Sequence, residues 1–215
     1  MTEQNFDQMR RAMVASQLRT TGVNDPAVVA AMSEVPRERF VPADRRAVAY
    51  ADAAVPLGEG RALNPPMVVG RLLTEAHLKG DESVLVIGAG TGYSAAVLAR
   101  LVHAVTMVED SATLAGQARA ALAGTGVAVV EGPLNIGHAA GGPYDFILID
   151  GAVEEIPQAI LDQVEQGEIA FVLADRGVTR LAIGRVAGRA LGTTIIADAA
   201  AATLPGFAKP RGFSF

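Results

Sequence analysis

The sequence predicts an α/β fold built on a doubly wound, mostly parallel sheet with an antiparallel edge near the C-terminus. Strand-length apolar runs alternate with segments of helical periodicity from residue 83 to residue 173, which is typical of βαβ units. The run Ser83–Ile87 is continuously apolar after its first residue, as expected of a strand buried on both faces. A glycine-rich turn follows this run directly. Together these observations favour one domain over 1–215.

The first eighty residues differ from the rest and form an expected N-terminal extension, 1–80. Apolar residues recur at helical spacing over 5–20, which predicts an amphipathic helix. Asp25 and Pro26 are typical of the N-cap and first position of a second, short helix. A long stretch rich in Pro and Gly follows before helical periodicity returns over 66–78. Ordered loops of such length are usually functional.

The core, 81–175, is expected to contain alternating strands and helices. In chain order these are strand 83–87, helix 93–102, strand 104–108, helix 111–123, strand 127–130, strand 144–149, helix 156–166 and strand 169–173. The remaining segment, 176–215, is punctuated by glycine and contains a β-branched run at 193–196. We expect closing strands there, including the antiparallel edge.

Composition excludes several classes of function. Half of the 215 residues are hydrophobic and 19% are charged, which disfavours disorder. The net charge of −5 offers no basic footprint for nucleic acid. With no cysteine and three scattered histidines, no metal site is expected. The N-terminus shows no signal-peptide pattern and glycines interrupt the longest apolar stretch, so we expect a soluble cytoplasmic protein without a membrane span, either a monomer or a dimer.

The glycine turn carries the most specific signal in the chain. Gly88, Gly90 and Gly92 follow the apolar strand, and a helical segment starts at Tyr93. Glu109 lies 21 residues after Gly88, at the end of the next expected strand, where an acidic side chain can accept hydrogen bonds from ribose hydroxyls. The Gly-x-Gly-x-Gly spacing differs from the dinucleotide fingerprint and is the pattern of S-adenosylmethionine methyltransferases. NAD binding and a purely structural turn are the less favoured alternatives.

Ordered blocks along most of the chain extend this pattern. They are Met13-Val14-Ala15-Ser16-Gln17-Leu18, Val35-Pro36-Arg37-Glu38-Arg39-Phe40-Val41-Pro42, Ala49-Tyr50-Ala51-Asp52, Val55-Pro56-Leu57-Gly58-Glu59-Gly60, the glycine motif with Tyr93-Ser94-Ala95-Ala96-Val97-Leu98-Ala99, Tyr144-Asp145 and Glu155-Ile156-Pro157. With these blocks the chain resembles the protein-L-isoaspartate O-methyltransferase family, as a divergent member.

The resemblance implies a Rossmann-like fold and methyl transfer from S-adenosylmethionine to the carboxylate of isoaspartyl residues in damaged proteins or peptides. The Pro- and Gly-rich segment would cover the site, with Asn64 as the catalytic residue and Ala62, Leu63 and Pro66 at the substrate. The expected cofactor-binding residues are Gly88, Ala89, Gly90, Thr91, Gly92, Tyr93, Glu109, Asp110, Gly132 and Asp150.

The sequence departs from the family pattern at three places. The family usually writes Thr-Ile-Ser-Gln-Pro where this chain has Ala62-Leu63-Asn64-Pro65-Pro66, so Asn64 replaces a serine hydroxyl with an amide that can still donate. The family's Gly-Asp-Gly is here Glu131-Gly132-Pro133, and Pro133 offers neither an acceptor side chain nor a backbone N–H. Asp150, at the end of an expected strand, is either a ligand-facing carboxylate or a turn residue beside Gly151.

Two alternative functions follow from these departures. One is a non-catalytic or repurposed relative that binds a nucleoside or a partner. The other is a metal-dependent O-methyltransferase for a small catechol-like molecule, with Asp150 and Asp175 as oxygen ligands. The charged residues Arg37, Glu38 and Arg39 and the pair Arg45-Arg46 are interpreted as a solvated face.

Overall fold

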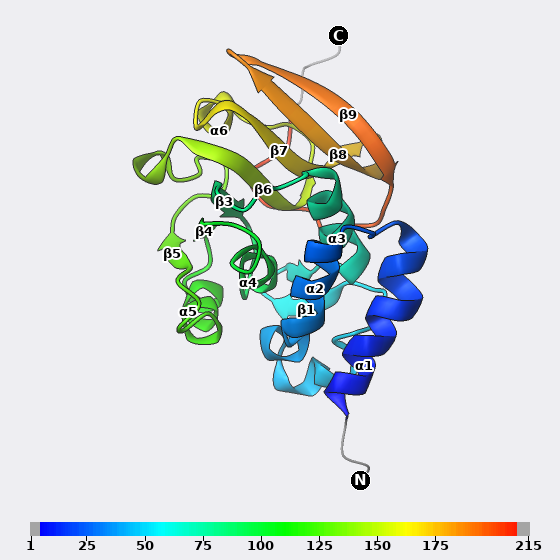
Figure 1. Cartoon of the computed structure of the whole chain (residues 1–215). Helices are drawn as coiled ribbons and strands as arrows, with labels where there is room; N and C mark the ends of the chain where they lie inside the picture. Colours follow the sequence, from blue (N-terminus) through cyan, green and yellow to red (C-terminus); the bar gives the residue numbers. More distant parts are fainter. Residues whose placement is uncertain (1–4, 210–215) are drawn as a thin grey trace.

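The computed structural model describes residues 5–209, without the side chains of residues 165 and 166. Seven strands form the central sheet in the order β5-β4-β3-β6-β7-β8-β9, and the first five are parallel (Figure 1). The strands are β3 (Ser83–Ile87), β4 (Ala104–Glu109), β5 (Ala128–Glu131), β6 (Tyr144–Val153), β7 (Val164–Asp175), β8 (Val178–Ala187) and β9 (Ala190–Asp198). This arrangement confirms the predicted α/β fold class and its antiparallel edge.

The register of the central strands positions the site. Ile87, the last residue of β3, pairs with Val108 on one side and with Ile149 on the other. Gly88, Glu109 and Asp150 are therefore brought to the same carboxyl edge of the sheet. Residues 84–87 of β3 are fully buried, as the continuous apolar run predicted.

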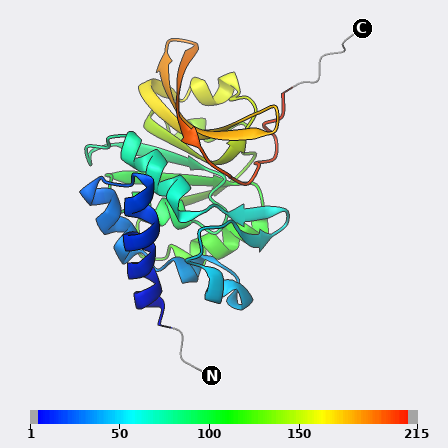
Figure 2. The ribbon, with the colours of Figure 1, turned by 90° about the vertical axis from the view of Figure 1, so that its right-hand side faces the viewer.

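The N-terminal helices pack together on one side of the molecule. Figures 1 and 2 both show α1, α2 and α3 side by side, with the β8–β9 hairpin at the far end from α1. The predicted N-terminal helix begins as α1, and a π-helical and a 3₁₀ turn continue it to Thr21. Asp25 caps α2 by accepting from the amides of Ala27 and Val28. The helices are α1 (Phe6–Met13), α2 (Pro26–Glu34), α3 (Pro66–Glu75), α4 (Tyr93–Leu98), α5 (Ala112–Ala121) and α6 (Gln158–Leu161).

The predicted helix over 156–166 is wrong in extent, because α6 has four residues and β7 begins at Val164. Gln163 explains the early end. Its side-chain amide donates to the carbonyl oxygens of Ile136 and Ala159, and its backbone carbonyl accepts from Tyr144 N. These contacts divert the chain from the helix into the sheet.

The Pro- and Gly-rich segment contains more regular structure than the sequence predicts. It forms two 3₁₀ turns, Arg37–Phe40 and Ala43–Val48, and an antiparallel hairpin of β1 (Val55–Gly58) and β2 (Arg61–Leu63). After β9, residues 199–209 are not a further strand of the sheet. They cross its carboxyl edge, where Thr203 bridges to Ala152 in β6. Residues 210–215, which were expected to help close the sheet, lie outside the described residues.

Within 5–209, no helix has the length and apolar character that crossing a bilayer requires.

Candidate active site

The glycine turn after β3 has the backbone shape that its sequence predicts. Gly88, Gly90 and Gly92 have φ angles of 77°, 58° and 96°, in the left-handed region that side chains disfavour. The turn also has no room for a side chain at Gly90, because a Cβ there would lie 2.6 Å from Leu57 Cδ1. Tyr93 then starts α4. The strand–turn–helix context of a nucleoside site is therefore present.

Glu109 ends β4 directly beside this turn, and its side chain is 0% exposed. Its Oε2 accepts from Gly90 N at 2.9 Å, and its Oε1 accepts from Ser111 N at 3.2 Å. Burial raises the pKa of Glu109 to about 7, against the opposing charge of Arg61. The carboxylate is thus held by the turn at the position from which ribose hydroxyls are bound in folds of this kind.

Arg61, in β2, reaches the same carboxylate from the covering hairpin. Its Nη1 donates to Glu109 Oε1 at 2.6 Å and to Asp110 Oδ1 at 2.9 Å, and its Nη2 donates to the carbonyl oxygen of Gly88 at 2.7 Å. The residue is 7% exposed. Arg61 was not among the residues predicted for the site. The only feature of the sequence that pointed to it was its position, as a basic residue between Gly60 and the residues that depart from the family pattern.

A cavity of about 420 Å³ lies next to this pair, at the carboxyl ends of β4 and β5. It contains the predicted cofactor residues Asp110 and Gly132, and residues of the C-terminal segment close it from the other side. The lining residues are Asp110, Glu131, Gly132, Pro133, Leu134, Asn135, Pro205 and Gly206. The cavity has room for a flat aromatic base beside the ribose position.

Asn64 and Asp150, predicted separately, are in direct contact. Asn64 Nδ2 donates to Asp150 Oδ1 at 2.9 Å and to Asp150 O at 3.1 Å, and Asn64 Oδ1 accepts from Ala202 N at 2.9 Å. Asn64 is 1% exposed. Its amide therefore joins the covering hairpin, β6 and the C-terminal segment at one point.

Arg37 is buried rather than solvated, so the predicted charged face is wrong for this residue. Its side chain is 0% exposed and donates to the carbonyl oxygens of Ala49 at 2.6 Å and Asn64 at 2.5 Å. The guanidinium carbon lies 4.6 Å from the centroid of the Tyr93 ring. This is a cation–π contact that secures the segment leading to Asn64.

Most of the other predicted site residues are buried around the glycine turn and the covering hairpin. Tyr93 is fully buried, and its ring also packs edge-on against Phe40. Thr91 is buried and donates from Oγ1 to Phe40 O at 2.5 Å. Of the remaining positions, Ala89, Leu63 and Pro66 are buried and Ala62 is half-buried. Asp110 is the more exposed of the two carboxylates beside Arg61, at 36% of its side chain.

The alternative metal ligands are not brought together. Among the side chains described within 5–209, no group of three or more His, Cys, Asp or Glu is placed to hold a metal ion. Asp175 lies 3.5 Å from Arg180 Nη2 instead, and Asp150 is bonded to Asn64.

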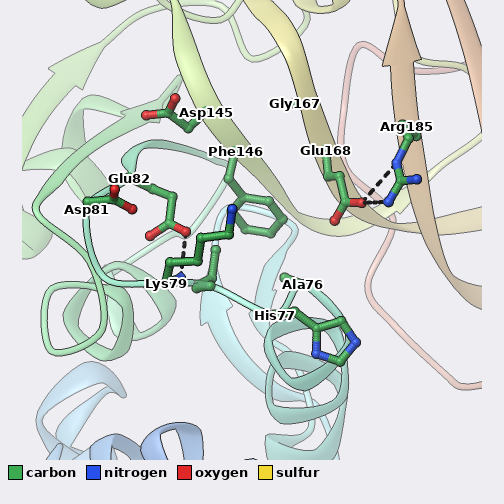
Figure 3. Close-up of a pocket in the computed structure, with 11 residues that line it drawn as sticks. Ala76, His77, Lys79, Asp81, Glu82, Asp145, Phe146, Gly167, Glu168 and Arg185 are labelled. Carbon is green, nitrogen blue, oxygen red and sulfur yellow. Dashed lines mark hydrogen bonds and ion pairs between the residues drawn. The ribbon is translucent and has the colours of Figure 1, made fainter.

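A second cavity, of about 590 Å³, lies at the opposite edge of the sheet (Figure 3). Three of its carboxylates are engaged locally: Glu82 accepts from the amides of Lys79 and Gly80, Asp145 from Ser83 N, and Glu168 from Arg185. Ligands of open parallel sheets bind outside the carboxyl ends of the strands. We therefore assign the candidate active site to the edge that carries Glu109.

A mostly parallel sheet, a Gly-x-Gly-x-Gly turn after its central strand and a buried acidic residue ending the next strand define the class of S-adenosylmethionine-dependent methyltransferases. Within that class, the family model of protein-L-isoaspartate(D-aspartate) O-methyltransferase (PCMT) matches residues 9–184. The chain belongs to this family, as its sequence blocks predicted.

Similar proteins agree with this assignment. The chain is 40% identical to protein-L-isoaspartate O-methyltransferase 1 of Rhodopseudomonas palustris (strain HaA2), over 82% of this chain and 74% of that protein. It is 40% identical to the protein-L-isoaspartate O-methyltransferase of Methanoregula boonei, over 88% and 83%.

Solved structures agree with the fold. A protein-L-isoaspartate O-methyltransferase superposes with a TM-score of 0.81 at 23% identity, over 92% of this chain and 66% of that chain. A Plasmodium falciparum structure, described as a beta-aspartate methyltransferase (PCMT) in complex with S-adenosyl-L-homocysteine, superposes with a TM-score of 0.78 at 16% identity, over 94% and 99%.

Proposed function

We propose that this protein transfers a methyl group from S-adenosylmethionine to the free carboxylate of an isoaspartyl residue in a damaged protein or peptide, in the cytoplasm. The observation that carries the proposal is the buried carboxylate of Glu109 held against the glycine turn at the carboxyl edge of the sheet. Family membership supports the same reaction.

The residues at this edge match the chemistry of the cofactor. Glu109 supplies carboxylate oxygens for ribose hydroxyls, and the cavity beside Gly132 has room for the adenine base. Gly88 and Gly90 add no side chain of their own that would obstruct a close approach to the backbone. The guanidinium of Arg61 lies at the same carboxylate and donates to Glu109.

The chain's contribution to the reaction is alignment and exclusion of water. When bound, S-adenosylmethionine supplies a methyl group on a sulfonium, a strong electrophile, and the acceptor carboxylate is already an anion that needs no base. The protein therefore has to hold acceptor oxygen and methyl carbon in line. Leu57 of the hairpin and Leu204 of the C-terminal segment pack against the glycine turn and contribute apolar surface there.

We propose Asn64 as the residue that positions the acceptor side of the site. Because Asn64 stands where the family has a serine, the sequence predicts that it donates a hydrogen bond to the substrate. Its amide donates to Asp150 and accepts from Ala202, which supports a role in holding the surrounding segments in place.

The test is a methyl-transfer assay with isotopically labelled S-adenosylmethionine and an isoaspartyl peptide. We expect a methyl ester on the isoaspartyl peptide, none on the same peptide with normal aspartate, and an unchanged rate in EDTA. Binding of S-adenosylhomocysteine without any transfer would contradict the proposed reaction. A rate that requires a metal ion and a catechol would favour the small-molecule alternative.

A further inference from the structure

The ribose-binding carboxylate already has a partner supplied by the chain itself. Glu109 Oε1 accepts from Arg61 Nη1 at 2.6 Å, and Glu109 Oε2 accepts from Gly90 N. Glu109 Oε1 also accepts from Ser111 N, so about one of the roughly four acceptor sites of the carboxylate is left, whereas two ribose hydroxyls need two. Arg61 and a nucleoside are therefore competitors for Glu109.

Arg61 also occupies the space over the glycine turn. Its Nη2 donates to Gly88 O, and a Cβ added at Gly88 would lie 3.1 Å from the same nitrogen. Close approach of a ligand to the backbone is what a glycine at this position allows. In this structure the guanidinium of Arg61 makes that close approach, and the residue is only 7% exposed.

The ion pair between Arg61 and Glu109 is strong enough to compete with the ribose hydroxyls of a nucleoside. A buried carboxylate without its counter-ion pays a desolvation cost that neutral hydroxyl donors repay less well than a cation does. Asp110 adds a second carboxylate to the same guanidinium nitrogen, at 2.9 Å. Breaking the contact between Arg61 and Glu109 is thus part of the free-energy cost of binding a nucleoside.

A second position is open to the Arg61 side chain once it leaves Glu109. Asp110 is 36% exposed, so the guanidinium can keep this partner while it swings out of the turn toward solvent. The hairpin that carries Arg61 is fixed at its tip, where Ser111 Oγ donates to Glu59. The movement therefore needs only a rotation of the side chain, with the hairpin in place.

We propose that Arg61 competes with the nucleoside for Glu109 and in this way sets the affinity of the protein for its cofactor. The inference rests on the proposed function, because it takes the ligand at this edge to be an adenosine derivative. In the ligand-free protein Arg61 neutralises Glu109, and binding requires the state in which Arg61 has withdrawn. Apparent affinity is then lowered by the small population of that state.

The test is calorimetric titration of S-adenosylhomocysteine into the wild type and Arg61→Gln, with Arg185→Gln as the matched control. Arg185 pairs with Glu168 on the surface at the opposite edge, so its variant loses the same charge away from the site. We expect Arg61→Gln to bind about 10- to 100-fold more tightly than the wild type, and Arg185→Gln to bind like the wild type. Without ligand, Arg61→Gln should melt at a lower temperature, and S-adenosylhomocysteine should raise its melting temperature by more.

Each other outcome overturns the inference. Equal or weaker binding by Arg61→Gln, with wild-type binding intact, removes the competition and leaves the proposed function standing. Failure of both proteins to bind S-adenosylhomocysteine overturns the proposed function as well. If Arg61→Gln does not fold, a crystal structure of the wild type with S-adenosylhomocysteine decides: Arg61 withdrawn from Glu109 supports the competition, and Arg61 still bonded to Glu109 overturns it.

Discussion

At the residue scale, two buried polar side chains organise the carboxyl edge of the sheet. Glu109 ties β4 to the glycine turn and to the covering hairpin through Arg61. Asn64 ties the segment after that hairpin to Asp150 and to Ala202. Both belong to positions that the sequence singled out, but their partners Arg61 and Ala202 could not be foreseen, because they come from distant parts of the chain.

We predict that Asn64→Ala destabilises the protein by about 2–4 kcal/mol, because it leaves the buried Asp150 and the half-buried amide of Ala202 without a partner, at roughly 1–3 kcal/mol for the buried group and less for the half-buried one. Methyl transfer to an isoaspartyl peptide should fall by about 10- to 100-fold, since small displacements at a reacting centre are costly. Urea unfolding and initial rates measure the two effects.

The matched control for this variant is Gln158→Ala, which also removes a side-chain amide and its hydrogen bond, to Asp162 at an exposed site. We expect a change within about 0.5 kcal/mol there. Wild-type stability and rate in Asn64→Ala would show that the amide neither holds the edge together nor serves the reaction.

Glu109 gives the protein a distinctive pH dependence of stability. Burial raises its pKa from 4.5 to about 7 in the folded protein, so the folded state binds the proton more tightly than the unfolded chain between these values. This contribution stabilises the fold at low pH and is lost as the pH rises from about 4.5 to about 7. From pH 5 to pH 8, the wild type should lose on the order of 1–3 kcal/mol more than Glu109→Gln, whose side chain does not titrate.

The measurement is urea unfolding of both proteins at several pH values at constant ionic strength. The difference between the two free energies of unfolding isolates the proton that Glu109 binds. A difference that stays constant from pH 5 to pH 8, or one that grows in favour of the wild type, would contradict this assignment.

At the scale of elements, the glycine turn is constrained by packing as well as by its backbone angles. Gly92 has a φ of 96°, and a Cβ there would lie 2.7 Å from Leu122 Cδ1. Gly124 has a φ of 81° but open space around it. Substitutions at Gly92 and Gly124 therefore distinguish the cost of backbone strain alone from the added cost of steric crowding.

We predict that Gly124→Ala costs about 1–2 kcal/mol of stability, the ordinary penalty of a left-handed backbone. Gly92→Ala should cost about 1–3 kcal/mol more, because Leu122 is buried and has little room to shift. Denaturant unfolding measures both. Equal losses at the two positions would mean that only the backbone angle restricts the turn.

The elements that the sequence predicted well are those defined by local pattern. The apolar run of β3, the cap of α2 by Asp25 and the glycine turn all follow from neighbouring residues. The elements predicted poorly depend on distant contacts. The predicted helix over 156–166 is cut short where Gln163 bonds Ile136, and the β1–β2 hairpin pairs residues within a stretch that had no strand pattern.

At the scale of the whole molecule, two segments far apart in sequence cover the same edge of the sheet. Leu57 and Arg61 of the hairpin lie over the glycine turn, and Leu204 of the C-terminal segment packs against Gly88 and Gly151. The hydrogen bond from Ala202 N to Asn64 Oδ1 joins the two segments directly. Sequence could assign the hairpin to the site through the family pattern, but not its junction with the C-terminal segment, since that contact spans 138 residues.

The junction predicts that the two segments respond to a ligand together. S-adenosylhomocysteine bound at Glu109 would contact both, and binding stabilises the parts of a protein that close on the ligand. We expect slower amide hydrogen exchange over 55–64 and over 199–207, and no change at the tip of the β8–β9 hairpin, 186–191, which lies at the opposite edge of the sheet. Mass spectrometry of peptic fragments with and without ligand measures this change in exchange rate.

In Asn64→Ala, which lacks the bond to Ala202, protection should persist in 55–64 and weaken in 199–207. Protection confined to one segment in the wild type would show that they do not act as one cover.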